Sequence, residues 1–433
     1  MLEKWFHLTE RSSDAPTEVL AGVTTFLTML YIVVVNPAIL GAAGMNFDGV
    51  FMATVISSVL ATLIMGIFAN YPIVIAPGMG MNAYFAYSVV LGGGHSWQAA
   101  LGAVFISGIC FVLLSLTRFR YMLIDAIPAS LKHAITAGIG LFISFIGLQN
   151  AKIIVASPAT LVTLGRLSEP MPMIAVLGLA VSLILMIYRV KGFLFFGILA
   201  TAILAYCQGL LVLPENWLVL PSGLASTAWQ MDVSGVWNQG LYAVVFTFLL
   251  VTLFDTTGTM LGVAEQAGLL NEGKFPRVRG ALMADALGTA AGAALGTSPT
   301  SAYIESAAGV AAGGRTGLSA VTTAVLLLST LFFSPVAKML AGVPAVTAPA
   351  IILVGFFMMD GLKNIEWKDT EEAFPAFLIL VTMPLTYSIA TGIGVGFIAY
   401  PLLKLVRGCG REVSPMLYFF ALLFFIQIGF FSH

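Results

Sequence analysis

Residues 49–117 read GVFMATVISSVLATLIMGIFANYPIVIAPGMGMNAYFAYSVVLGGGHSWQAALGAVFISGICFVLLSLT and contain no Asp, Glu, Lys or Arg. A helix needs about 20 apolar residues to cross the hydrocarbon core of a bilayer, so a charge-free stretch of this length holds several crossings. Further charge-free runs cover 192–214, 233–254, 373–403 and 413–433. The sequence therefore predicts a multi-pass membrane protein built from helices.

The composition of the whole chain agrees with this prediction. Of its 433 residues, 59% are hydrophobic and 9% are charged, and the formal net charge is −1. Soluble proteins average about 45–50% apolar and about 25% charged residues. These values exclude a disordered chain, a nucleic-acid binder held by a basic surface, and an ordinary soluble enzyme. The three cysteines lack the spacing of a metal site or a disulfide framework, so we expect them to be packing residues.

The apolar segments predict fourteen spans in two sets of seven, and an additional C-terminal apolar segment at 414–431 that either spans the membrane or lies along it. Residues 1–18 form a polar N-terminal segment without a secretory signal pattern. The predicted spans lie near 19–36, 50–69, 73–91, 97–116, 128–149, 171–188 and 192–213, and then near 240–262, 279–296, 299–313, 316–335, 345–361, 372–389 and 391–407.

Basic residues predict the orientation of the spans, because cytoplasmic loops carry an excess of Lys and Arg. With the N-terminus in the cytoplasm, most basic residues fall on the cytoplasmic side, and Lys152, Arg166 and Lys338 are exceptions. We therefore expect a cell-membrane protein with a cytoplasmic N-terminus. The basic residues expected on the cytoplasmic side are Arg118, Arg120, Arg189, Lys191, Lys274, Arg277, Arg279, Lys363, Lys368, Lys404, Arg407 and Arg411.

Short motifs recur at an offset close to half the chain length. Residues 77–85, PGMGMNAYF, resemble residues 299–304, PTSAYI, and residues 147–150, GLQN, resemble residues 361–364, GLKN. An odd number of spans per repeat places the two halves in opposite orientations, which is a common build of secondary transporters. The predicted fold class is an all-α polytopic membrane protein with a 7+7 inverted repeat of spans.

Pro and Gly interrupt two matching spans, the third and the tenth. Residues 75–82, IAPGMGMN, hold one Pro and two Gly, and residues 296–301, GTSPTS, hold one Pro and one Gly. Pro removes a backbone donor, and Gly weakens a helix by about 1 kcal/mol relative to Ala. Paired breaks indicate a central binding site, with half-helices that begin near Asn82 and Ser301 and direct free N–H groups at the ligand. Close packing of Gly-rich spans is the alternative.

Three carboxylates, Asp255, Asp285 and Glu305, lie within apolar sequence. A charged group at the centre of a bilayer costs about 2.5–3.5 kcal/mol on insertion scales, so it persists where it faces a cavity, pairs with a cation or stays protonated. No mid-span Lys or Arg accompanies Asp255 or Glu305. We interpret these two as substrate contacts and proton-coupling groups, since a buried carboxyl group can exchange a proton near neutral pH. A structural hydrogen bond is the alternative for Asp255, and Asp285 fits a binding site and a helix brace equally well.

Five motifs are long enough to carry a family resemblance: EVLAGVTTFLT (18–28), VNP (35–37), APGMGMNAYFAY (76–87), FDTTGT (254–259) and YIESAAGVA (303–311). They resemble the AzgA-like purine permeases of the nucleobase–ascorbate transporter superfamily (nucleobase–cation symporter type 2). The resemblance implies a core domain, residues 19–127 and 240–335, and a gate domain, residues 128–213 and 345–407. It also implies short extended segments in spans 3 and 10, with the substrate between core and gate.

The resemblance assigns roles to particular residues. The acid that the family carries in span 8 falls on Asp255, that of span 10 falls on Glu305, and the polar Asn of span 3 falls on Asn82. Thr259 stands where uracil-type relatives have a His. Thr252 stands where some purine permeases carry a second acid, so this chain has no acid at that position.

The chemistry of these residues suits a purine base. Purines are flat, uncharged at neutral pH, and edged with N–H donors and ring-nitrogen acceptors. Two carboxylates can accept N–H bonds, an amide can serve a carbonyl or a ring nitrogen, and an aromatic ring such as Phe85 can stack on the base. The expected substrate contacts are Thr25, Phe26, Gly80, Asn82, Tyr84, Asp255, Thr259, Ser301, Tyr303 and Glu305.

We therefore expect a proton-coupled secondary transporter that imports purine nucleobases, with guanine and hypoxanthine favoured over adenine. We expect no metal and no cofactor, with a proton as the coupling ion. An anion or other small-molecule transporter of the same fold, or a channel, is the alternative, although anion carriers would lack one of the two acids. An enzyme is disfavoured because four scattered His residues form no catalytic constellation. The expected partners are the purine and the bilayer, not nucleic acid, and relatives often pair through the gate domain, which allows a homodimer.

Overall fold

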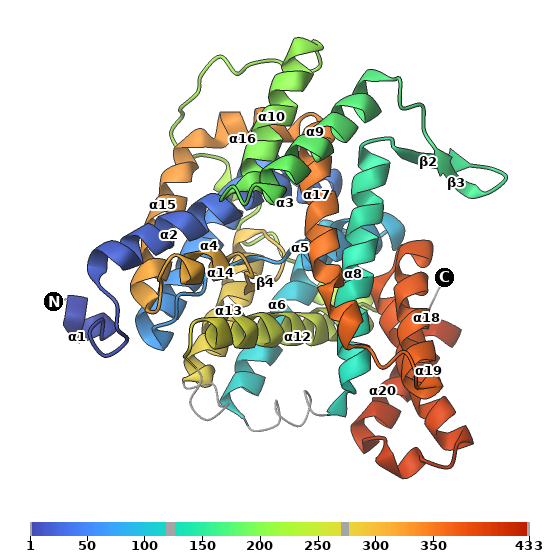
Figure 1. Cartoon of the computed structure of the whole chain (residues 1–433). Coiled ribbons are helices and arrows are strands. Elements are labelled where there is room, and N and C mark those ends of the chain that lie inside the picture. Colours follow the sequence, from blue (N-terminus) through green and yellow to red (C-terminus); the bar gives the residue numbers. More distant parts are fainter. Residues whose placement is uncertain (1, 118–125, 270–276, 431–433) are drawn as a thin grey trace.

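A computed structural model describes residues 2–117, 126–269 and 277–430. Figure 1 shows a mostly helical molecule in which segments from the two halves of the chain lie side by side. The predicted helical, polytopic architecture agrees with this arrangement. Among the basic residues used to orient the spans, Arg118, Arg120 and Lys274 lie outside the described residues.

The elements of the first half follow the order of the predicted spans; η marks short 3-10 or π-helical segments. They are α1 (Leu2–Phe6), α2 (Ala15–Met29), α3 (Ile32–Ala42), α4 (Phe47–Ile64), η1 (Met65–Ala69), β1 (Ile75–Pro77), α5 (Met79–Ala83), η2 (Tyr84–Gly92), α6 (Trp97–Leu116), α8 (Ala129–Asn150), β2 (Ile154–Ser157), β3 (Leu161–Leu164), α9 (Pro170–Ile187) and α10 (Phe193–Cys207).

The linker and the second half continue in the same way. Their elements are η3 (Leu224–Ser226), α11 (Val233–Asn238), α12 (Tyr242–Gln266), α13 (Val278–Leu295), β4 (Thr300–Ala302), α14 (Ser306–Ala311), α15 (Gly317–Ser329), η4 (Thr330–Phe333), α16 (Ser334–Ala341), α17 (Pro344–Met358), η5 (Met359–Asn364), α18 (Thr370–Thr386), α19 (Ile389–Val406), η6 (Gly410–Glu412) and α20 (Pro415–Phe430).

Nine helical stretches within the described ranges are long and apolar enough to cross a membrane. They coincide with predicted spans 1, 2, 4, 5, 6, 8, 11, 12 and 14. Predicted span 7 and the C-terminal segment form shorter apolar helices, α10 and α20. Predicted spans 3 and 10 are interrupted by strands, so their helices are too short to be among these nine. The count of fourteen crossings stays a prediction.

The first span bends at Leu30 and Tyr31, between α2 and α3. Pro37 lies inside α3 and has no N–H to donate to the carbonyl of Val33, one turn earlier. At the junction itself the helix is tighter, because the amide of Val33 bonds to the carbonyl of Leu30, three residues earlier. Proline is a common cause of helix kinks. The bend places Tyr31 near the middle of the span.

The two broken spans meet in a two-stranded antiparallel sheet inside the molecule. β1 pairs with β4, and both strands are fully buried. Threonine hydroxyls bond the outer edges: Thr62 of α4 both donates to and accepts from the backbone of Ile75, and Thr289 of α13 accepts from the amide of Thr300. The backbone groups freed by the breaks are thus bonded within the protein, as the bilayer requires.

The short helices after these strands begin at Met79 and Ser306, and the prediction that they begin near Asn82 and Ser301 was wrong. Asn82 lies inside α5, and Ser301 lies inside β4. Pro and Gly locate a break in a span, but they do not fix the residue at which helical geometry resumes.

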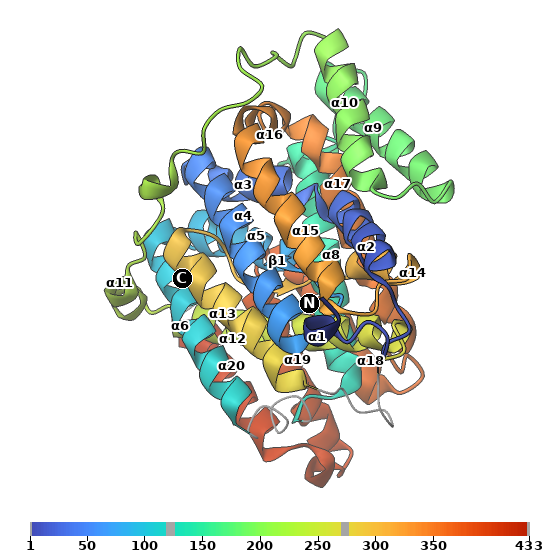
Figure 2. The ribbon, with the colours of Figure 1, turned by 90° about the vertical axis from the view of Figure 1, so that its left-hand side faces the viewer.

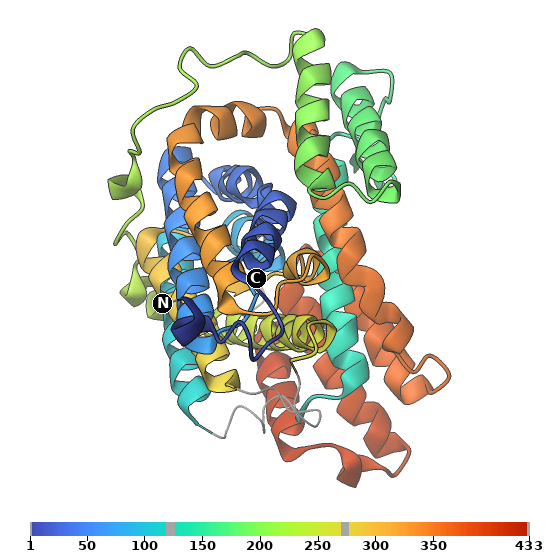
Figure 3. The same ribbon diagram turned by 60° about the vertical axis from the view of Figure 1, so that its left-hand side comes forward.

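The helices pack into two groups, which we call the first and the second helix group. The first group contains α2 to α6 and α12 to α15, and the second contains α8 to α10 and α17 to α19. Figure 2 shows α2, α4, α13 and α15 of the first group close together, and in Figure 3 the second group occupies the right-hand side. The two groups meet where α5 and α12 contact α8, and also where α2 contacts α10, α3 contacts α17 and α12 contacts α19.

Two connections contain structure that the sequence analysis did not predict. β2 and β3 form an antiparallel hairpin after α8. The linker 208–241 crosses one end of the first group, where the amides of Val219 and Trp229 bond the carbonyls of Phe332 and Ala294. These segments lie in the two longest connections between predicted spans, residues 150–170 and 214–239.

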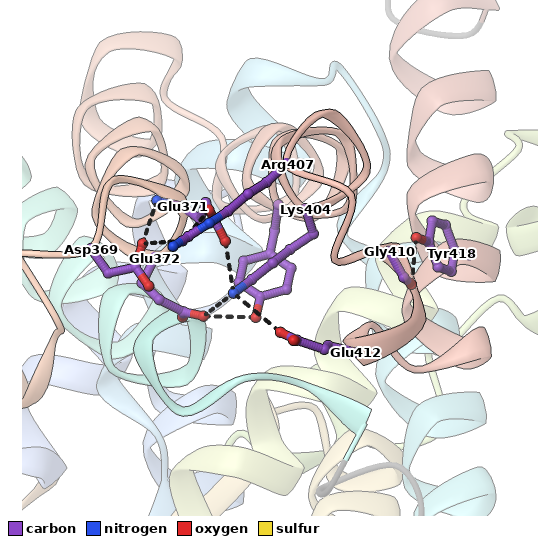
Figure 4. A network of polar contacts seen from close by, with 9 residues as sticks. Asp369, Glu371, Glu372, Lys404, Arg407, Gly410, Glu412 and Tyr418 are labelled. Atoms are coloured by element: carbon purple, nitrogen blue, oxygen red, sulfur yellow. Dashed lines mark hydrogen bonds and ion pairs between the residues drawn. The ribbon is translucent and has the colours of Figure 1, made fainter.

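Charged side chains gather where α18 begins and α19 ends (Figure 4). Lys404 lies 3.0 Å from Glu371 and 3.4 Å from Glu372, and Arg407 also pairs with Glu371. Tyr400 donates a hydrogen bond of 2.7 Å to Glu372. Lys404 is only 7% exposed, so these carboxylate partners must offset the free-energy cost of burying its charge. The cluster ties α18 to α19 within the second group.

Candidate functional site

Asp255 lies in the middle of α12, partly buried, where the two helix groups meet. Its side chain lines a small cavity, and Ser301 of β4 lies beside its carboxylate. The cavity therefore brings a carboxylate together with walls that are mostly apolar, the usual composition of a small-molecule site. The lining residues are Gly80 and Met81 of α5, Val251, Phe254 and Asp255 of α12, Ile135, Thr136 and Ile139 of α8, and Met358 of α17.

The cavity is closed in this structure. Its volume is about 10 Å³, which is room for about one water molecule. Small-molecule pockets usually measure about 300–1,000 Å³, so a ligand can enter only if the two helix groups separate. Gly80 belongs to this closure, because a Cβ atom at its position would lie 2.6 Å from Cγ2 of Ile139.

Glu305 lies just before α14, at the second broken segment, and is partly buried. Its Oε1 atom accepts a hydrogen bond of 2.7 Å from the hydroxyl of Tyr31. Its backbone carbonyl lies 3.4 Å from the hydroxyl of Thr28. Asp255 lies close enough to interact electrostatically with Glu305. The two acids thus occupy one region of the first helix group.

Asp285, for which a site role and a structural role were equally open, is a brace between three elements. It is fully buried, and its carboxylate accepts bonds of 2.5 Å from Thr256 of α12 and 2.9 Å from Thr300 of β4. Asp285 itself belongs to α13. Both carboxylate oxygens are held by protein hydroxyl groups, which gives this acid a structural place at the sheet.

Three further residues of the broken segments bond to protein instead of facing the cavity. Asn82 is fully buried, and its side-chain oxygen accepts a bond of 2.5 Å from Ser298. Tyr303 is 4% exposed and donates a bond of 2.5 Å to the carbonyl of Pro77. Ser301 is 2% exposed and lies beside Asp255. The contacts of Asn82 and Tyr303 join the two broken segments to each other.

The remaining predicted substrate contacts are buried or partly buried away from the cavity. Tyr84 is buried and meets the ring of Phe248 edge-on, at a centroid distance of 5.1 Å. Thr25 is buried where α2 packs against Gly309 of α14. Phe26 and Thr259 are partly buried. Of the ten residues that the sequence nominated, only Gly80 and Asp255 line the cavity in this closed arrangement.

Sequence reasoning missed the second helix group's share of the cavity and the partner of Glu305. Ile135, Thr136 and Ile139 lie in an apolar run of α8 that gives no sign of a site. Met358 ends α17 in a similar run. Tyr31 had an available signal, because it lies one and a half turns before a proline within a span.

A second set of contacts joins the two groups away from the cavity. The side-chain amide of Asn150 in α8 donates a bond of 3.0 Å to the hydroxyl of Tyr87 in η2. Ser88 donates a bond of 2.6 Å to the backbone carbonyl of Tyr387, which follows α18. Tyr387 also bonds to Gln149 and has a φ of 57°, which is rare for an aromatic residue. These contacts fix the end of α8 against the third span.

The comparisons with known proteins agree on one family. The model described as "Permease family" (Xan_ur_permease) matches residues 16–395. Guanine/hypoxanthine permease PbuO of Bacillus subtilis is 53% identical over 428 residues, covering 98% of this chain and 99% of PbuO. Adenine permease AdeP of Escherichia coli is 44% identical, covering 99% and 96%. Guanine/hypoxanthine permease PbuG of B. subtilis is 45% identical, covering 96% and 97%.

Solved structures with the same fold are more distant in sequence. The transmembrane domain of a cyanobacterial bicarbonate transporter, BicA, superposes with a TM-score of 0.67 at 16% identity, covering 87% of this chain and 96% of that chain. SLC26A9 superposes with a TM-score of 0.64 at 11% identity, covering 90% and 65%. These neighbours have the 7+7 inverted-repeat fold, in agreement with the predicted repeat. The family match over most of the chain and the high identity to full-length permeases show that the chain belongs to the Permease family.

Proposed function

We propose that this permease is a proton-coupled importer of purine nucleobases, with guanine and hypoxanthine as its main substrates. The observation that carries the proposal is the position of Asp255, a carboxylate that lines a cavity shared by the two helix groups. The ion pairs found within the described ranges involve other carboxylates, so Asp255 and Glu305 have no Lys or Arg partner there. The printed names of PbuO and PbuG support the substrate class.

The chemistry of the cavity supports an uncharged, flat ligand. Asp255 and Glu305 would accept N–H bonds from the edge of a purine. Phe254 and Met358 offer apolar contact to its faces, and Thr136 offers a hydroxyl from the opposite wall. A site of this kind binds through a few placed polar groups within an apolar pocket.

In the proposed mechanism the two helix groups act as core and gate. The core comprises residues 19–127 and 240–335, and the gate comprises residues 128–213 and 345–407, in a chain of fourteen spans in the cell membrane with a cytoplasmic N-terminus. Protonation of Asp255 or Glu305 favours purine binding from outside, and relative movement of core and gate carries both inward. The contacts of Tyr87 with Asn150 and of Ser88 with Tyr387 lie on the outer side in this topology, so they open when the purine enters.

An adenine permease is the second candidate, because AdeP matches nearly the whole chain. Anion transport is less well supported: the likeness to BicA and SLC26A9 is below 20% identity and concerns the fold alone. Two carboxylates close together would also repel an anion.

Uptake measurements test the proposal directly. Cells that lack their own purine permeases, with and without this protein, are given radiolabelled guanine, hypoxanthine, adenine, xanthine or uracil at two external pH values. We expect concentrative uptake of guanine and hypoxanthine that increases at the lower pH. In Asp255→Asn we expect exchange of internal for external purine to persist while the dependence on the pH gradient is lost.

Two outcomes would contradict the proposal. Adenine uptake that exceeds guanine and hypoxanthine uptake would assign the chain to the second candidate. Unchanged concentrative uptake in both Asp255→Asn and Glu305→Gln would refute the role of the two acids in proton coupling.

A further inference from the structure

Tyr31 contacts one of the two acids of the proposed site. Its hydroxyl donates a hydrogen bond of 2.7 Å to Oε1 of Glu305, and its side chain is only 1% exposed. Hydrogen bonds between a hydroxyl and a carboxylate at this length are charge-assisted and roughly twice as strong as neutral ones. The bond joins the first span to the second broken segment, 274 positions along the chain.

The bend of the first span brings Tyr31 to this place. The helix of the first span is interrupted at Leu30 and Tyr31, between α2 and α3, and Tyr31 is the last residue before α3 begins. Thr28, almost one turn earlier, approaches the backbone carbonyl of Glu305. Two side chains beside the same bend therefore converge on one acid.

Of the titratable groups around Glu305, Tyr31 is the one that donates a hydrogen bond to its carboxylate. Tyr303 and Asp255 are the other titratable groups in electrostatic contact with it. Tyr303 already donates its hydroxyl to the carbonyl of Pro77. Within the described ranges, the side-chain hydrogen bond to the carboxylate of Glu305 comes from Tyr31 and not from Asp255.

A glutamate side chain has three rotatable bonds, so its carboxylate has no fixed position unless a partner holds it. A binding group that must meet a substrate in one geometry needs such a partner to lock its rotamer. The bond from Tyr31 occupies Oε1 of Glu305 and restricts the rotation of its side chain. Oε2 is then presented in a defined direction.

We propose that Tyr31 is a positioning residue for purine recognition: it holds Glu305 so that Oε2 accepts an N–H of the base. This inference rests on the proposed function and adds the residue that makes the geometry of Glu305 selective. Tyr31 acts through Glu305 and does not itself touch the purine.

The test compares two tyrosines that make the same bond. Tyr31→Phe removes one oxygen and keeps the buried ring. Tyr400→Phe is the matched control, because Tyr400 is also buried and donates a hydrogen bond of the same 2.7 Å to a carboxylate, Glu372, in the cluster of Figure 4. Both variants lose a hydroxyl-to-carboxylate bond, so any general loss of stability is common to both.

The readouts are hypoxanthine uptake kinetics and inhibition by hypoxanthines methylated on each ring nitrogen in turn. In Tyr31→Phe we expect KM to rise about tenfold with Vmax little changed, which is the pattern of lost substrate binding. The methylated analogue that wild type rejects most strongly should be rejected less, because a freely rotating Glu305 no longer demands an N–H at one place. In Tyr400→Phe we expect KM within about twofold of wild type and unchanged rejection of the analogues.

The outcomes separate this inference from the proposed function. Wild-type purine uptake combined with equal KM and equal analogue rejection in wild type and Tyr31→Phe would overturn the inference alone. The same change in KM and analogue rejection in both Phe variants would also overturn it, since the effect would then be structural. No wild-type uptake, together with no purine-induced rise in the thermal unfolding temperature of the purified protein, would overturn both.

Discussion

The two broken segments have the same backbone plan and different chemistry. Each consists of a three-residue strand followed by a short helix, and the strands pair with each other. The first segment carries Asn82, which is fully buried and bonded to Ser298. The second carries Glu305, which is partly exposed and held by Tyr31. The backbone of the repeat is symmetric, and the charge that we assign to binding belongs to one half.

This difference indicates a division of labour. The first segment supplies space, since Gly80 lines the cavity without a side chain. The second supplies a hydrogen-bond acceptor. Substitutions in the two segments should therefore fail in different ways: those in the second should affect transport, and those in the first should affect closure or stability.

The largest effect is expected for Glu305→Gln. The amide replaces an ionisable acceptor with a group that presents only one acceptor oxygen, and a hydrogen bond to a charged group is worth about 1.5–3 kcal/mol. We expect purine uptake to fall by about 100-fold at an unchanged amount of protein in the membrane. Glu366→Gln, at an exposed position in the loop before α18, is the control and should keep wild-type uptake. Uptake by Glu305→Gln within about twofold of that control would contradict the assignment of substrate binding to the second segment.

The next largest effect is expected for Gly80→Ala. The added methyl group would meet Ile139 at 2.6 Å, and overpacking costs about 1–3 kcal/mol. We expect Vmax to fall about tenfold, because the two helix groups can no longer close over the cavity. Gly258→Ala on α12 is a matched control, since no atom lies within 4 Å of its added Cβ. The double variant Gly80→Ala with Ile139→Ala should recover uptake; failure to recover would assign Gly80 a role other than closure.

A smaller effect, on stability, is expected for Asn82→Ala. The hydroxyl of Ser298 would lose its acceptor in a fully buried place, which costs about 1–3 kcal/mol. We expect a lower thermal unfolding temperature in detergent and a KM for hypoxanthine within about threefold of wild type. A large rise in KM at unchanged unfolding temperature would show that the first segment also binds the base.

The smallest effect is expected for Tyr303→Phe. This variant removes the bond between the Tyr303 hydroxyl and the carbonyl of Pro77, and a neutral hydrogen bond is worth about 0.5–1.5 kcal/mol. Thermal unfolding should shift down slightly, with substrate selectivity unchanged. A change in the preference between guanine and adenine would instead place the Tyr303 ring or hydroxyl at the ligand.

The fold was predictable from the sequence because its signals are local. Apolar stretches, several of them free of charges, indicated the positions of the helices, and paired Pro and Gly residues indicated the two breaks. The β2–β3 hairpin could also have been predicted, since β-branched residues flank the turn around Pro158. The exact starts of α5 and α14 could not, because helix ends are settled by capping and tertiary contacts.

The site was predictable only in part, because it depends on contacts between distant segments. Asp255 and Glu305 stood out as charges without partners in apolar sequence. Asp285 stood out in the same way, and only the hydroxyls of Thr256 and Thr300 distinguish it as a brace. In the sequence, Thr136 has no feature that marks it as a site residue. The folded structure shows that it lines the cavity opposite α12. The sequence pattern identifies a charged residue in an unusual place, and the contacts in the folded structure determine its role.

The β1–β4 pairing has a consequence for how the chain is made. The amide of Gly78 bonds to the carbonyl of Pro299, and the amide of Tyr303 bonds to the carbonyl of Val74. When the ribosome has completed only the first half, Gly78 and Val74 lack these partners, and each unbonded backbone group in hydrocarbon costs several kcal/mol. The backbone of the third span therefore completes its hydrogen bonds only after the tenth span has been synthesised. Biogenesis must shelter the first broken segment for the time that translation of more than two hundred further residues requires.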